Sequence, residues 1–224
     1  MGAVENLQAA DGFTLAAYRA KPAGTVKRGA VVVIQEIFGV NAHIRNVTDG
    51  FAAEGYEAIA PALFDRAQRN VELGYDDKGA DIGVELRGRI PVDQTLADVA
   101  AAVKAVSSAG PVAVIGYCWG GSIAFLSATR LSGVACAVGY YGGRIAAHAD
   151  EKSKVPVLLH FGEKDHGIPM SDVAKIREKR PDVEIQVYPA DHGFNCDVRG
   201  SYDPASAKLA LQRSLAFLDQ HFKA

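Results

Sequence analysis

Short runs of apolar, often β-branched residues alternate along this chain with stretches that carry apolar residues at helical spacing. The runs predict strands at 4–8, 13–20, 30–35, 56–60, 112–115, 134–140, 155–161 and 183–188, and the stretches predict helices at 44–54, 91–106, 119–131, 169–179 and 204–222. Strands that alternate with helices pair in parallel and bury both faces of their sheet under helices. We therefore expect an α/β fold with a mostly parallel, twisted sheet, formed by residues 1–224 as a single domain. Ligands of such sheets bind at the carboxyl ends of the strands.

The overall charge argues against several kinds of partner. Lys and Arg together number 24 and Asp and Glu number 26, which gives a net charge of −2. A nucleic-acid or anionic-membrane binder needs clustered positive charge, so we expect neither partner. No apolar run is long enough to cross a membrane, and the first residues, from Met1, lack the basic stretch and apolar run of a secretory signal. We therefore expect a cytoplasmic protein whose three cysteines are free thiols.

The segment 116–121 (GYCWGG) joins the predicted strand 112–115 to the predicted helix that follows. This is the nucleophile-elbow pattern G-x-nucleophile-x-G, with Cys118 where many hydrolases carry serine. The sharp turn exposes the nucleophile, and a helix amino terminus favours the thiolate that attacks. The alternative is an ordinary strand–helix turn with a buried cysteine. The strand–turn–helix context favours the elbow.

An elbow of this kind requires an acid and then a histidine at later strand ends. Asp165 follows the strand 155–161, and His192 follows the strand 183–188. His192 would accept the proton of Cys118, and Asp165 would hold the imidazole in the required tautomer. Weaker candidates for the acid are Glu163, Asp172 and Asp191. Four other histidines are predicted to be a core residue (His160), a turn or rim residue (His166) and surface residues (His148 and His221).

A metal site is the main chemical alternative at these positions. His192 and Cys196 are four residues apart, a spacing found in zinc sites, and Cys118 would be a third ligand. No C-x-x-C pair accompanies them, and Cys136 lies in an apolar strand as a small buried residue would. We therefore expect no metal. No phosphate-binding or dinucleotide glycine motif is present, so no cofactor is expected either.

The chain resembles the dienelactone hydrolases, or carboxymethylenebutenolidases, which are cysteine-nucleophile members of the α/β-hydrolase fold. The resemblance spans nearly the whole chain and is most specific at 35–41 (QEIFGVN), 116–121 (GYCWGG) and 138–142 (VGYYG), together with the loops of Asp165 and His192. It implies the α/β-hydrolase fold and a small lactone or ester as the substrate.

The resemblance also implies roles for individual residues. The triad would consist of Cys118, Asp165 and His192. Glu36 would contact the resting thiol until a bound substrate moves it, whereupon Glu36 takes the thiol proton and the thiolate swings toward the histidine. An ordinary salt-bridged carboxylate is the alternative for Glu36. The backbone N–H groups of Ile37 and Trp119 would form the oxyanion hole.

The sequence departs from the family pattern where the substrate binds. The family's type enzyme holds a substrate carboxylate with arginines, one of them four residues after the catalytic histidine, where this chain has Cys196. Arg199 is a candidate replacement, and Phe38 and Tyr140 are further candidates for substrate contacts. The second arginine would fall in segment 64–90, a polar connection typical of a cap or binding loop. Its candidates, for which solvated surface charge is the alternative, are Lys78, Arg87 and Arg89.

We therefore expect hydrolysis of a lactone or small ester through an acyl-thioester on Cys118. One alternative is a broad carboxylesterase or thioesterase that uses the same triad. Another is a non-catalytic sensor on the same fold, in which Cys118 responds to oxidants. An oriented base favours the enzyme, since a thiol sensor needs none. The expected partner is a small molecule, and the sequence leaves the oligomeric state open, with a monomer plausible.

Overall fold

The structure is a computed structural model and describes residues 2–24 and 28–222. Met1, the first residue of the segment in which no secretory signal was expected, lies outside the described residues. One sheet has the strand order β1-β2-β4-β3-β5-β6-β7-β8. Its strands are β1 (Ala3–Gln8), β2 (Thr14–Ala20), β3 (Ala30–Ile34), β4 (Glu57–Pro61), β5 (Val112–Tyr117), β6 (Cys136–Tyr140), β7 (Val157–Gly162) and β8 (Glu184–Tyr188). The pairs β1–β2 and β2–β4 are antiparallel, and the remaining pairs are parallel. The expected mostly parallel sheet is confirmed.

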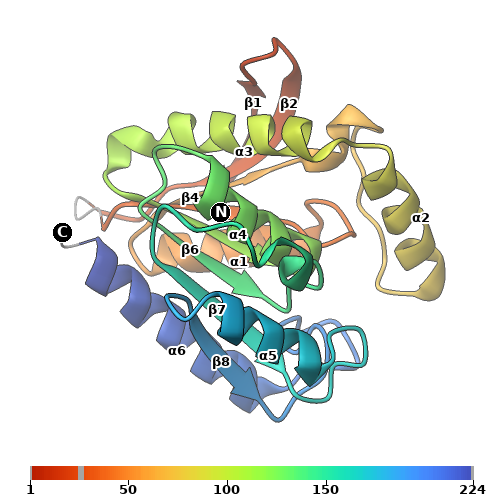
Figure 1. Cartoon of the computed structure of the whole chain (residues 1–224). Helices are drawn as coiled ribbons and strands as arrows, with labels where there is room; N and C mark the ends of the chain where they lie inside the picture. Colours follow the sequence, from red (N-terminus) through yellow and green to blue (C-terminus); the bar gives the residue numbers. More distant parts are fainter. Residues whose placement is uncertain (1, 25–27, 223–224) are drawn as a thin grey trace.

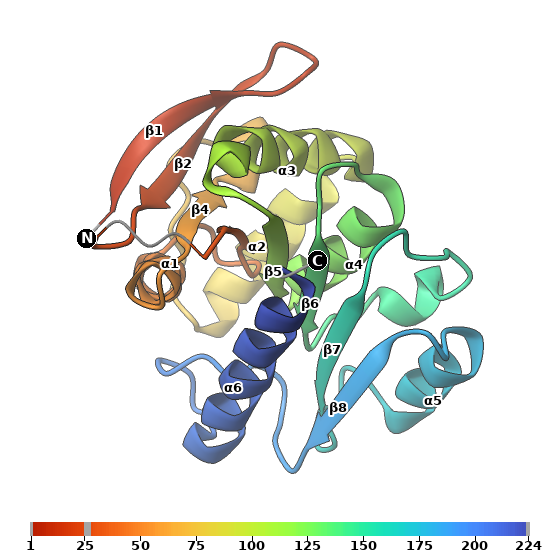
Figure 2. The same cartoon turned by 90° about the vertical axis from the view of Figure 1, so that its left-hand side faces the viewer.

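Helices cover both faces of this sheet, as Figure 2 shows. They are α1 (Ala42–Ala53), α2 (Asp77–Gly88), α3 (Val92–Val106), α4 (Trp119–Arg130), α5 (Met170–Lys179) and α6 (Pro204–His221). Helices α1 and α6 lie on one face, and α3, α4 and α5 lie on the other. The strands β3, β4, β5, β6 and β7 are buried along their whole length, which explains their continuous apolar runs. Among the described residues, no helix is both long and apolar enough to cross a membrane.

Segment 64–90 is more ordered than a binding loop. A short 3-10 helix (Leu63–Arg66) is followed by α2, which lies on the right of Figure 1, apart from the sheet. Asp76 caps α2 by accepting a hydrogen bond from the N–H of Gly79 at 2.7 Å. Glycine obscured this helix in the sequence because it is a poor helix former. At Gly83 it is required, since a Cβ atom there would lie 1.9 Å from the carbonyl oxygen of Ile37.

Candidate active site

Cys118 lies at a strained turn between β5 and α4. Its φ of 54° and ψ of −116° are unusual for a residue with a side chain, and its N–H donates to the carbonyl of Tyr140 at 3.0 Å. The turn is tight because α4 starts against the sheet: a Cβ atom at Gly120 would lie 2.5 Å from the carbonyl oxygen of Ile34. This is the backbone geometry that the sequence pattern predicts for a nucleophile elbow.

His192 and Asp165 meet beside this turn. Nδ1 of His192 lies 2.6 Å from Oδ2 of Asp165, which is 4% exposed. The other carboxylate oxygen of Asp165 accepts the N–H groups of Gly167 and Ile168 at 2.8 and 3.1 Å, so the carboxylate is held in place. Because a carboxylate only accepts, Nδ1 carries a proton and Nε2 is left for another partner.

The pKa of His192 is shifted by the same neighbours. Burial lowers this pKa, but the side chains of Asp165 and Cys118 raise it more, so that it rises from 6.5 to about 10. The imidazole is therefore protonated near neutral pH and lies within interaction range of the Cys118 side chain. Such a group can balance a thiolate and later donate its proton to a leaving group.

The backbone N–H groups of Ile37 and Trp119 are the predicted donors of the oxyanion hole. Ile37 follows β3, and Trp119 is the first residue of α4, at the positive end of the helix dipole. Neither N–H donates to an acceptor within residues 2–24 and 28–222. Unpaired donors beside a nucleophile are what an oxyanion hole requires.

Glu36 is fully buried, and its partner is Arg199. Nη1 of Arg199 donates to Oε1 of Glu36 at 3.3 Å, and no hydrogen bond joins Glu36 to Cys118 among the described residues. Gly193, with a φ of 78°, makes room for this arginine, since a Cβ atom there would lie 2.6 Å from Nη1 of Arg199. Among the described residues Glu36 therefore pairs with Arg199 rather than forming a hydrogen bond with Cys118, and its contact with the resting thiol stays a prediction.

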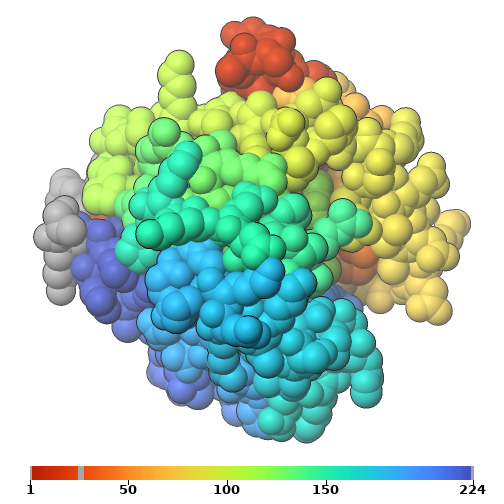
Figure 3. Space-filling model, in the orientation of Figure 1, coloured from red at the N-terminus to blue at the C-terminus, as the bar shows by residue number. Residues whose placement is uncertain are grey.

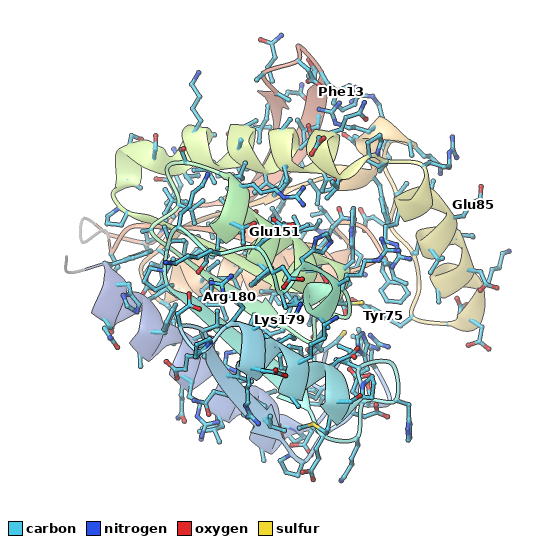
Figure 4. All side chains as sticks on the ribbon, in the orientation of Figure 1. Phe13, Tyr75, Glu85, Glu151, Lys179 and Arg180 are labelled. Atoms are coloured by element: carbon cyan, nitrogen blue, oxygen red, sulfur yellow. The ribbon has the colours of Figure 1, made fainter. Side chains whose placement is uncertain are left out.

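Several buried polar atoms around Glu36 have no hydrogen-bond partner in the described part of the chain. They are Oε2 of Glu36, Nε2 of His43 and the hydroxyl oxygens of Tyr75 and Tyr141. Tyr75 lies between α2 and the body of the molecule, whereas Glu85 points outward from α2 (Figure 4). Cys196 belongs to the same cluster, and burial raises the pKa of its thiol to about 11. The zinc set considered from the sequence, with His192 and Cys118, is not the set that gathers with Cys196.

A cavity of about 430 Å³ opens beside the elbow. Trp119 and Ser122 line it from α4, and Arg87 and Arg144 also line it. Figure 3 shows the surface hollowed between α2 and the segment after β6. Burial and the neighbouring Arg144 lower the pKa of Arg87, which forms no salt bridge with any described residue. Two guanidinium groups that have no acidic partner among residues 2–24 and 28–222 make this cavity suited to an anion.

The structure separates the other expected site residues. Tyr140 is fully buried, and its hydroxyl lies 2.7 Å from Oγ of Ser214 in a network that also holds His160. The expectation that Tyr140 contacts substrate is therefore wrong, because its side chain lies in the core. Phe38 is buried against Tyr75, with ring centroids 4.4 Å apart. The expected core position of His160 is confirmed, and its burial lowers its pKa to about 3.

The residues that sequence reasoning missed stand next to those it found. Tyr141 comes directly after β6, and its ring centroid lies 5.1 Å from that of His192. Its position one residue beyond a strand end was the available signal. His43, in the first turn of α1, carried no comparable signal, since the chain brings it to Glu36 and Cys196 only on folding. Lys78 and Arg89 are exposed on and beside α2, as the surface-charge alternative requires.

The sheet order, its helical cover and a cysteine, histidine and aspartate gathered at the strand ends define an α/β-hydrolase. The chain belongs to the dienelactone hydrolase family, whose sequence profile matches residues 15–222. A carboxymethylenebutenolidase of Pseudomonas putida is 32% identical over 224 residues, which cover 95% of this chain and 94% of that relative. A Synechocystis sp. protein, provisionally named a carboxymethylenebutenolidase, is 36% identical over 219 residues, or 89% of each chain.

A solved structure supports the same assignment. The crystal structure of a Klebsiella pneumoniae protein, provisionally named a dienelactone hydrolase, superimposes with a TM-score of 0.84. The two proteins are 34% identical, and the match covers 97% of this chain and 99% of that one. The expected family and fold are both confirmed.

Proposed function

We propose that this protein opens lactones or small esters by nucleophilic attack of Cys118. Membership of the dienelactone hydrolase family makes the chain a hydrolase of ester bonds. One observation carries the finer proposal: Cys118, His192 and Asp165 form a connected set. Cys118 occupies a strained turn, its side chain interacts with that of His192, and Nδ1 of His192 lies 2.6 Å from Oδ2 of Asp165. A nucleophile, a base and an orienting acid are the parts that covalent catalysis needs.

In the first half of the reaction, the Cys118 thiolate attacks the carbonyl carbon of the ester. The carbonyl oxygen becomes an oxyanion, which the N–H groups of Ile37 and Trp119 stabilise. The tetrahedral intermediate then collapses, the carbon–oxygen bond of the ester breaks, and imidazolium of His192 gives its proton to the leaving oxygen. A thioester on Cys118 remains.

In the second half, neutral His192 takes a proton from water, which attacks the thioester carbonyl. Collapse of this intermediate releases the acid and returns the thiolate beside a protonated His192. With a lactone substrate, the leaving hydroxyl stays attached to the acyl chain, so the product is a single hydroxy acid. Asp165 holds the ring through both halves and does not itself take a proton.

The cavity beside the elbow favours a substrate that carries a carboxylate. Arg87 and Arg144 line it without an acidic partner among the described residues. The side chain of Arg87 also interacts electrostatically with that of Cys118. The substrate carboxylate would pair with these arginines while its ester carbonyl lies at Cys118. Arg199 is engaged by Glu36 in this structure, so we assign it a smaller part in substrate binding.

A panel of lactones and esters, each with and without a carboxylate, tests the proposal. We expect hydrolysis that falls by at least about 10⁴-fold in Cys118→Ala and His192→Ala. Cys136→Ala is the matched control, since Cys136 is a buried thiol in β6 away from the strand end. Wild-type rates in both active-site variants would contradict the assignment. Thioester cleavage that exceeds ester cleavage would favour a thioesterase, and no turnover of any ester would favour the non-catalytic sensor.

A further inference from the structure

Three side chains with metal-ligating atoms form a buried cluster around Glu36. One ligand atom from each of Glu36, His43 and Cys196 lies within 4.8 Å of the other two, and all three residues are buried. They come from the loop after β3, the first turn of α1 and the loop after β8, three segments that the fold brings together. Ligand atoms around a tetrahedral zinc ion lie roughly 3.3–3.8 Å apart, so a contraction of about 1 Å would complete the site.

The hydrogen bonds of the cluster leave two acceptors with no donor. Nδ1 of His43 lies 2.9 Å from Oδ1 of Asp197, and a carboxylate only accepts, so this nitrogen donates. In the neutral ring, Nε2 then carries no proton and is an acceptor, and it has no hydrogen-bond partner within the described residues. Oε2 of Glu36 is likewise buried and unpartnered, although Arg199 takes the other oxygen. Two buried acceptors of this kind call for a cation between them.

The pairing of His43 with Asp197 is also the support that metal-binding histidines commonly have. A ligating imidazole usually donates its second N–H to a carboxylate, which fixes the ring and its tautomer. Asp197 is largely exposed, with 59% of its side-chain surface accessible, whereas His43 is 4% exposed. Asp197, at the surface, therefore supports the buried His43, which belongs to the cluster.

We propose that Glu36, His43 and Cys196 bind one divalent transition-metal ion of the zinc class. Thiolate, imidazole and carboxylate form a ligand set that suits Zn²⁺, and three protein ligands leave a fourth position open. Binding displaces the thiol proton of Cys196 to solvent, so that the carboxylate and thiolate balance the two charges of the metal.

Spectroscopic titration of metal-free protein with Co²⁺ tests the site directly, because Co²⁺ takes the ligands of Zn²⁺ and a thiolate ligand adds a charge-transfer band. We expect the wild type and Cys118→Ala each to bind one Co²⁺ per chain with this band. Cys196→Ala should lose the band, and His43→Gln should weaken binding at least 100-fold. Asp197→Asn, on the surface, should weaken binding about 10–100-fold without a risk to folding. His148→Gln, away from the cluster, is the control and should bind as the wild type does.

Three results would overturn the inference: no Co²⁺ binding by the wild type, unchanged affinity in both His43→Gln and Asp197→Asn, or a band that survives in Cys196→Ala but disappears in Cys118→Ala. The last result would put the metal on the proposed nucleophile instead. A parallel assay of ester hydrolysis by the metal-free protein separates the two proposals. Hydrolysis without Co²⁺ binding would refute only the metal site, and Co²⁺ binding without hydrolysis would refute only the proposed function.

Discussion

Replacing Asp165 by Asn should remove most of the activity while leaving the loop folded. The asparagine oxygen can still accept the N–H groups of Gly167 and Ile168, as Oδ1 of Asp165 does. Its amide nitrogen then faces Nδ1 of His192, which must become the acceptor and carry its proton on Nε2 instead. A histidine in this tautomer cannot accept a proton from Cys118.

The size of the effect follows from the pKa of His192. A rise from 6.5 to about 10 corresponds to about 5 kcal/mol in favour of the imidazolium, and the side chains of Asp165 and Cys118 supply it against the opposing effect of burial. Loss of the carboxylate removes part of this preference and the correct tautomer, so we expect kcat to fall by about 10³–10⁴-fold. The same substitution in a serine protease triad costs about 10⁴-fold, which agrees with this size.

The assay is kcat and KM on a lactone, together with a thermal melt of each variant. We expect a large fall in kcat, a small change in KM and a melting temperature near that of the wild type. Asp172→Asn is the matched control, since Asp172 lies in the first turn of α5, outside the proposed triad. An Asp165→Asn protein that stays folded and retains kcat within about tenfold of the wild type would refute the role of Asp165.

Three further predictions follow from the described contacts. Arg66→Ala should lower the free energy of unfolding, measured by urea denaturation, by about 3–5 kcal/mol. The reason is that the substitution leaves the fully buried carboxylate of Asp98 without its 2.7 Å ion pair. A loss below about 1 kcal/mol would contradict this. The raised pKa of His192 stabilises the fold fully below about pH 6.5, and this stabilisation should be lost as the pH rises through about 10. Urea titrations of the wild type and His192→Gln should therefore converge over that range, and a constant difference would be inconsistent with it. Arg87→Gln should raise KM about tenfold for esters that carry a carboxylate and leave neutral esters unchanged; equal effects on both would remove the anion site.

The local sequence pattern was enough to predict the sheet and most of the candidate catalytic residues at the carboxyl ends of its strands. The apolar runs of β3, β4, β5, β6 and β7 became strands that are buried on both faces. The loops after β5, β7 and β8 lie together because their strands are parallel. Cys118, Asp165 and His192 were therefore predictable as neighbours. Strand limits shifted where apolar residues continue past the ladder, as at Val134 and Val155.

Features that depend on packing between distant segments were not predictable. Helix α2 is rich in glycine, and the close approach of its backbone to the loop of Ile37 explains Gly83 only once the fold is known. Tyr140 and Tyr141 are adjacent, but the end of β6 directs one into the core and the other toward His192. His43 meets Glu36 and Cys196 from three separate segments, two loops and the first turn of α1, so no spacing in the sequence marks that cluster.

The most direct test of the central claim is to find the acyl group on Cys118. The wild-type protein, mixed with an activated ester and quenched in acid during turnover, should carry the acyl mass on the peptide that contains Cys118. Neutral hydroxylamine should remove that mass, as expected for a thioester, and Cys118→Ala should show no adduct. An acyl group on Cys136 or Cys196, or rapid turnover with no adduct on any cysteine, would contradict the assignment of Cys118 as the nucleophile.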